Sequence, residues 1–110
     1  SGKQINKKWL ELKDKYDLDF KINGFESLTS FVFKKNNLKY KTFITQEMLK
    51  KNILASNSIY FSIKHSDKIL EKYFYYLDRI FKTIGECEEG RDINSLLETP
   101  ISESTFRRLN

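Results

Sequence analysis

The sequence predicts an α+β fold, a small antiparallel sheet of about three strands covered by helices in the order α-β-β-α-β-α. The prediction rests on hydrophobic period, which is about 3.6 residues along one side of a helix and 2 along one side of a strand. Both periods occur between residues 42 and 67. Helical spacing around Ile44 and Met48 changes to strict alternation from Ile59 to Ile63, which predicts a helix that leads into a strand.

The N-terminal third is expected to form a helix and then a hairpin. The helix is indicated by apolar residues spaced four, three and four apart, which are Ile5, Trp9, Leu12 and Tyr16. Alternation follows from Leu18 to Ile22, and Asn23-Gly24 comes next, the pair that best tolerates the positive φ angles of a tight turn. Residues 25–33 should therefore pair back antiparallel.

The second helix is expected from Phe43 to Lys51, after a polar turn at residues 34–37. Thr42 is its predicted N-cap, because a threonine hydroxyl can accept a hydrogen bond from a backbone N–H that has no partner in the first turn. Asn52 should end the helix, since asparagine is one of the few residues besides glycine that adopt the left-handed conformation.

A third, long helix capped by Ser66 is the clearest pattern in the chain. Spacings of three and four along two adjacent rows define its expected buried side, which consists of Ile69, Leu70, Tyr73, Phe74, Leu77, Ile80, Phe81 and Ile84. The aromatic run at residues 73–76 is assigned to core packing because of the same helical spacing, and Trp9 is assigned there as well.

After residue 84 the chain becomes charged and loop-like. Gly85 should end the long helix, and Asp92 should cap a short turn through Leu97 that Pro100 ends. The single cysteine, Cys87, permits no intrachain disulfide, which predicts a reducing, cytoplasmic setting. Its neighbours on both sides are acidic and would oppose a reactive thiolate.

Length and composition indicate one soluble domain. The 110 residues are 39% apolar and 15% aromatic, enough for a single core, while 32% charged residues and a mean hydropathy of −0.59 indicate a strongly solvated exterior. No apolar run approaches the roughly 20 residues that cross a bilayer, so no membrane association is expected. Ser1 and Gly2 are interpreted as a cloning remnant, which leaves residues 3–110 as the domain.

Residues 46–65, QEMLKKNILASNSIYFSIKH, resemble the C-terminal small domain of class III pyridoxal-phosphate-dependent aminotransferases of the glutamate-1-semialdehyde aminomutase type. In that family a helix and a turn lead to a strand that ends in a Ser-x-x-His-Ser/Thr signature, which Ser62, His65 and Ser66 match. The similarity extends more weakly from Trp9 to Leu109. It implies the C-terminal domain of a fold-type I enzyme, a fragment of a longer chain.

The resemblance also implies a division of roles in the whole enzyme. The preceding large domain would hold pyridoxal phosphate, so this segment would carry no catalytic, cofactor-binding or metal-binding residue and would be inert alone. Asn57, Ser58 and Tyr60 would line the substrate cleft. A full-length enzyme of this type would form a homodimer and act as a transaminase or an aminomutase. The aminomutases carry a glutamate where Asn57 stands, so glutamate semialdehyde is disfavoured and an amino sugar or another amine stays open.

Other chemical sites find less support in the residues. His65 is the only histidine, and with Cys87 it gives too few ligands for zinc. A hydrolytic triad of Ser62, His65 and Asp67 would need glycines around the serine, which has bulky apolar neighbours instead. A structural hydrogen-bonding role is therefore favoured for His65.

The net charge of +5 leaves nucleic-acid binding as an alternative. A basic sheet whose strands carry aromatics such as Phe31 and Phe33 is how RNA-recognition sheets are built. The lysines near this strand are Lys34, Lys35, Lys39, Lys41, Lys50 and Lys51. Residues 28–30 lack the basic residue and glycine of the RNP1 pattern, so RNA binding is disfavoured. A protein-interaction module stays open, because a fragment exposes the face that contacts the rest of its protein.

Overall fold

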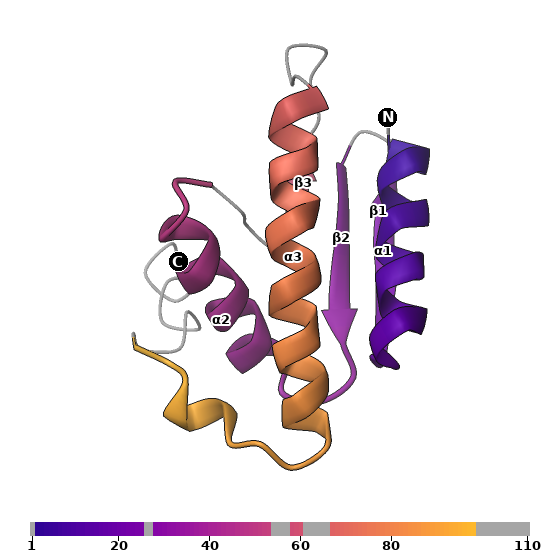
Figure 1. The fold of residues 1–110 in the computed structure, drawn as a ribbon. Helices are drawn as coiled ribbons and strands as arrows, with labels where there is room; N and C mark the ends of the chain where they lie inside the picture. Colours follow the sequence, from indigo (N-terminus) through magenta and orange to yellow (C-terminus); the bar gives the residue numbers. More distant parts are fainter. Residues whose placement is uncertain (1, 26–27, 54–57, 61–66, 99–110) are drawn as a thin grey trace, which may run out of the picture.

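The computed structural model describes residues 2–25, 28–53, 58–60 and 67–98. In chain order these residues form α1 (Gly2–Tyr16), β1 (Phe20–Phe25), β2 (Leu28–Phe33), α2 (Asn37–Leu49), β3 (Ser58–Tyr60), α3 (Asp67–Glu88) and a short 3-10 helix, η1 (Ile93–Ser95). The predicted α+β class and the predicted order of helices and strands are confirmed (Figure 1).

The sheet has the strand order β1-β2-β3, and both neighbouring pairs are antiparallel. The hairpin was predicted correctly, but its turn was not. Asn23 and Gly24 lie inside β1, opposite Ser30 and Thr29, and pairing continues to Phe25 opposite Leu28. The connection thus falls on residues 26–27, outside the described residues. These three pairs extend the backbone ladder beyond Ile22, and this outweighs the local turn preference of Asn-Gly.

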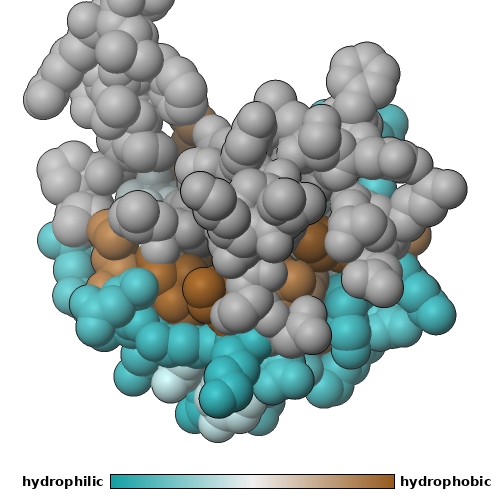
Figure 2. Space-filling model, turned by 90° about the horizontal axis from the view of Figure 1, so that it is seen from above, coloured by the Kyte–Doolittle hydropathy of each residue, from teal (hydrophilic) through white to brown (hydrophobic). Residues whose placement is uncertain are grey.

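The core lies between the sheet and a helix layer in which α3 runs between α1 and α2 (Figure 1). Its centre is aromatic. Phe81 of α3 lies 5.5 Å from Phe20 and 5.6 Å from Phe31 between ring centroids, and Trp9 meets Phe31 edge-on at 4.8 Å. Each fully buried side chain of this size contributes about 1.5–3 kcal/mol to folding. The core assignment of Trp9 is confirmed. In the view from above, hydrophilic residues form the lower rim of the molecule, and apolar residues lie just inside this rim (Figure 2).

Most of the predicted buried side of α3 is confirmed. Five of its residues are buried and two are partly buried: Tyr73, Leu77, Ile80, Phe81 and Ile84, and Leu70 and Phe74. Ile69 was predicted to be buried but is 51% exposed. At 100° per residue Ile69 lies about 60° from the centre of the buried stripe, and it belongs to the first turn of the helix. A residue at the edge of the stripe and the end of the helix has few neighbours to cover it.

Gly85 does not end α3, contrary to the prediction, because the helix continues to Glu88. A Cβ at Gly85 would lie 3.3 Å from the carbonyl oxygen of Tyr16, so the glycine lets α3 approach the end of α1 closely.

The helix α3 is closed by Gly90, whose φ of 125° favours glycine, and Arg91 N–H donates to the Glu86 carbonyl at 3.0 Å. The helices α1 and α3 are also joined by Asp78, which accepts hydrogen bonds from Tyr16 Oη and, at 2.9 Å, from Lys15 Nζ.

The helix α2 begins six residues before the predicted start at Phe43. Thr42 is therefore not an N-cap. Its Oγ1 donates to the Leu38 carbonyl at 2.7 Å inside the helix. The start is fixed instead by Asn36, which has a φ of 56°, and by Asn37, whose Oδ1 accepts a hydrogen bond from Phe33 N–H at 2.9 Å. This bond ties the start of the helix to the end of β2, a contact between elements that local propensity does not reveal.

The helix α2 ends at Leu49, two residues before the predicted Lys51, but the predicted closure at Asn52 is found. Asn52 has a φ of 60°, the left-handed conformation expected of it. Its N–H donates to the Leu49 carbonyl at 3.0 Å, and Ile53 N–H donates to the Met48 carbonyl at 2.9 Å. These two bonds are those of a Schellman closure, which satisfies carbonyls that the helix leaves free.

The cap at Asp92 is also confirmed, since Asp92 Oδ1 accepts a hydrogen bond from Asn94 N–H at 3.0 Å. The turn that it caps is η1, which ends at Ser95 rather than at the predicted Leu97. The predicted Ser66 cap and Pro100 lie outside the described residues, and so does the end of the predicted third strand at residues 61–63.

Candidate functional site

The predicted cleft and signature residues fall mostly outside the described part of the chain. Asn57 lies there, and so do Ser62, His65 and Ser66, so their roles stay predictions. Ser58 and Tyr60 belong to β3, where they stand opposite Ser30 and Leu28 of β2. Among the described residues, β3 is the last strand of its sheet and pairs with β2 alone, which leaves one edge free of described partners. The edge of a strand can accept further backbone partners.

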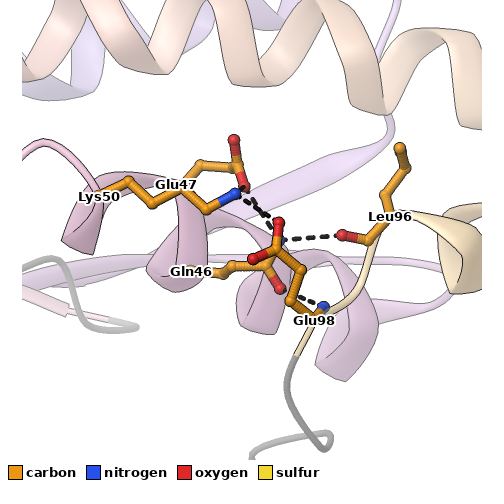
Figure 3. Close-up of polar contacts among 5 residues, drawn as sticks. All are labelled: Gln46, Glu47, Lys50, Leu96 and Glu98. Carbon is orange, nitrogen blue, oxygen red and sulfur yellow. Dashed lines mark hydrogen bonds and ion pairs between the residues drawn. The ribbon is translucent and has the colours of Figure 1, made fainter.

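Gln46 of α2, the first residue of the segment that resembles the aminotransferase family, makes a set of polar contacts (Figure 3). This side chain is only 7% exposed, yet both ends of its amide are bonded. Nε2 donates to the Leu96 carbonyl at 2.9 Å, and Oε1 accepts from Glu98 N–H at 2.6 Å. Lys50 adds ion pairs at 3.0 Å to Glu47 and at 2.5 Å to Glu98. The QEMLKK segment thus holds the chain after η1 against α2, which is a structural role.

The aromatics of the RNA alternative are not available for base stacking. Phe31 and Phe33 are each 3% exposed and face the core. Lys34 and Lys35 are exposed, whereas Lys41 is buried and burial lowers its pKa. An RNA-recognition sheet stacks bases on exposed strand aromatics. The alternation of β2 places the two phenylalanines on the helix-covered face, which counts against that reading.

A groove of about 680 Å³ runs between α2 and α3, and we call it the α2/α3 groove. Seven cationic or aromatic residues line it: Phe43, Lys51, Tyr75, Tyr76, Arg79, Lys82 and Arg91. Two carboxylates, Glu47 and Glu86, lie among them. Its volume is in the range of ligand-binding clefts. The surface therefore combines a concave shape with an excess of positive charge.

Contacts within the α2/α3 groove place cations over aromatic rings. Lys51 Nζ lies 5.3 Å from the Tyr76 ring centroid, and the Arg79 guanidinium lies 5.8 Å from that of Tyr75. Arg91 pairs with Glu86 at 2.6 Å. These contacts orient the cationic side chains along the groove.

Sequence reasoning missed this surface because it assigned residues 73–76 as a block to the core. Tyr75 is 58% exposed and Tyr76 is only partly buried. A signal was present in the spacing, since Tyr75, Arg79 and Lys82 recur at intervals of four and three. Residues three and four apart lie on the same side of a helix, so these three residues share one side of α3 that is distinct from its buried side.

Chemistry based on a metal or on a thiolate finds no support among the described residues. Within ranges 2–25, 28–53, 58–60 and 67–98, no three His, Cys, Asp or Glu side chains are grouped to hold a metal ion. Burial raises the pKa of the Cys87 thiol, with Arg91 opposing and nearby carboxylates adding to the effect. In the same ranges every helix is too short or too polar to cross a bilayer.

Comparisons with protein-family models, with curated proteins and with solved structures give no match to this chain.

Proposed function

We propose that this chain is the C-terminal small domain of a class III pyridoxal-phosphate-dependent aminotransferase or aminomutase, and that it covers the substrate cleft in the complete enzyme. The observation that carries the proposal is the segment from Gln46 to Tyr60. It runs as a helix, a left-handed closure at Asn52 and an edge strand. The family resemblance implies this succession for the residues QEMLKKNILASNSIY.

We place the pyridoxal phosphate site outside this chain. The cofactor needs a Schiff-base lysine, an acid against its pyridine nitrogen and a phosphate cradle. The four glycines of the chain are isolated in sequence, so none belongs to a glycine-rich loop. Lys41 is the buried lysine of the described part, and burial is the sole cause of its pKa shift, with no charged partner contributing. We therefore assign cofactor binding to the large domain that would precede this segment, in a homodimer.

The contribution of this domain is then to shape the cleft and to exclude water from it. The free edge of β3, with Ser58 and Tyr60, is the described part of the proposed cleft wall. Enclosure of a reacting centre strengthens every electrostatic interaction within it. The Asn57 position, which carries an amide in place of a carboxylate, favours an amine substrate other than glutamate semialdehyde.

A cofactor titration tests the proposal. The isolated 110-residue chain, titrated with pyridoxal phosphate, should give no saturable Schiff-base absorbance, and a longer natural chain containing it should give one. Reduction with borohydride and peptide mapping would locate the modified lysine. A single saturable lysine within the isolated chain would overturn the division of roles.

Hydrogen exchange tests the position of the cleft. In the complete enzyme, exchange at Ser58–Tyr60 should slow at least about tenfold relative to the isolated chain, because the large domain would shield this edge. Tyr73, Leu77 and Ile80 of α3 serve as the internal control and should change little, since they are already buried in the core. Unchanged exchange at β3 would place the cleft elsewhere.

A further inference from the structure

The α2/α3 groove carries an excess of positive charge, because four cationic residues and two carboxylates line it. Arg91 is paired with Glu86, and Glu47 is paired with Lys50. Lys51, Arg79 and Lys82 line the same groove and form no ion pair with a described carboxylate. Three cations along one concave surface create a positive potential that attracts an anionic ligand.

The dimensions of the groove suit an extended peptide. The lining residues of α3 run from Tyr75 to Glu86, which is about 16 Å at 1.5 Å per residue. An extended segment of about five residues covers that distance at roughly 3.3 Å per residue. Arg79 and Lys82 lie on the α3 side and Lys51 on the α2 side, so cations reach the groove from both of its walls.

The chemistry of the groove favours carboxylates over nucleic acid. Stacking of bases requires free aromatic faces, whereas Lys51 and Arg79 already lie over the rings of Tyr76 and Tyr75. Glu47 and Glu86 would also repel a continuous run of phosphates. The spaced carboxylates of an acidic peptide can each pair with one cation of the groove while avoiding Glu47 and Glu86. The guanidinium of Arg79 can bind a carboxylate through two parallel hydrogen bonds.

We propose that the α2/α3 groove binds an acidic peptide segment of a partner protein, whose Asp and Glu side chains pair with Lys51, Arg79 and Lys82. Phe43 and Ile80 also line the groove but are buried, at 5% and 6% exposed, so only a small apolar area would contact the aliphatic parts of the peptide. This surface is lined by residues of α2 and α3 and by Lys51 and Arg91, so peptide binding there would not require the proposed enzyme.

The test uses a fluorescein-labelled peptide of about eight residues in which Asp and Ala alternate, which exceeds the length of the groove. Binding to the 110-residue chain is measured by fluorescence anisotropy. The double variant Arg79→Gln, Lys82→Gln should bind at least about tenfold more weakly. The matched control Lys34→Gln, Lys35→Gln removes the same charge from exposed positions outside the groove and should change binding less than about twofold.

Two single variants make the test independent of any folding defect. Lys51→Gln, on the opposite wall, should weaken binding about threefold or more, and Glu86→Gln, which frees Arg91, should strengthen it. Equal losses in both double variants would show that binding follows net charge alone and would overturn the proposal. A single-stranded RNA of the same charge serves as the competing ligand. If it binds more tightly than the peptide and the Arg79→Gln, Lys82→Gln variant loses that binding, the ligand of the groove is nucleic acid and the peptide proposal is overturned.

Discussion

The helices α2 and α3 are built on different principles. The 22 residues of α3 bury one side against the core and present polar side chains on the other. The 13 residues of α2 are buried on most sides, and the buried residues include Lys41, Thr42 and Gln46. A helix with one buried side is specified by hydrophobic period. A helix buried on most sides depends on the partners that satisfy its polar groups.

The comparison separates two sources of stability in this small domain. Truncation of a side chain on the buried side of α3 removes apolar contacts from a packed aromatic cluster. Truncation of a polar side chain on α2 instead leaves buried donors or acceptors without partners. The first kind of defect costs more free energy, because it combines lost burial with an unfilled cavity.

The largest effect is expected from Phe81→Ala in α3. Phe81 is fully buried and meets the rings of Phe20, Phe31 and Phe33, so its loss should lower the free energy of unfolding by about 3–5 kcal/mol. Ile69→Ala on the same helix is the control and should cost less than about 1 kcal/mol, because Ile69 is half-exposed. Urea unfolding measures both. Similar losses would mean that the buried side of α3 extends to Ile69.

The next effect concerns the polar contact of α2. Gln46→Leu keeps the volume but leaves Leu96 O and Glu98 N–H without their partner, which should cost about 1–3 kcal/mol. The control is Lys50→Gln, which removes exposed ion pairs and should cost about 1 kcal/mol or less. Thermal unfolding of the two variants under identical conditions distinguishes them. A neutral Gln46→Leu would show that α2 does not depend on the segment after η1.

Substitutions at the C-terminal ends of α3 and α2 should change the free energy of unfolding by smaller amounts and in opposite directions. Gly90 has a φ of 125°, so Gly90→Ala should destabilise the domain by about 1–2 kcal/mol. Asn52 has a φ of 60° at the end of α2, and Asn52→Gly should be neutral or stabilising by up to about 1 kcal/mol. Midpoints of urea unfolding measure both changes. A destabilising Asn52→Gly would indicate that the asparagine side chain makes a contact of its own.

The last effect is a pH dependence where α2 meets the end of α3. Burial, together with a hydrogen bond at 2.7 Å from Tyr40 Oη to Glu88, raises the pKa of Tyr40 from 10.0 to about 12. The folded state therefore holds this proton more tightly than the unfolded state. The contribution is fully present below pH 10 and is lost as pH rises toward 12. Tyr40→Phe should flatten the fall of unfolding free energy between pH 10 and 12, and an unchanged slope would contradict the assignment.

The sequence determined the features that depend on local period or on one residue's backbone preference. The class, the order of elements, most of the buried side of α3 and the closures at Asn52 and Asp92 all belong to this group. The cleft role of Asn57, Ser58 and Tyr60 stays a prediction, because Ser58 and Tyr60 are known only as part of β3 and Asn57 lies outside the described residues.

The tertiary structure alone decided the features that depend on contacts between distant segments. The start of α2 is set by the bond between Asn37 and the end of β2, and Gly85 stays helical because α1 packs closely against it. The α2/α3 groove likewise exists only when Lys51 is brought beside Arg79. Period and propensity act over a few neighbouring residues, whereas these features are fixed by free energies gained between residues far apart in the chain.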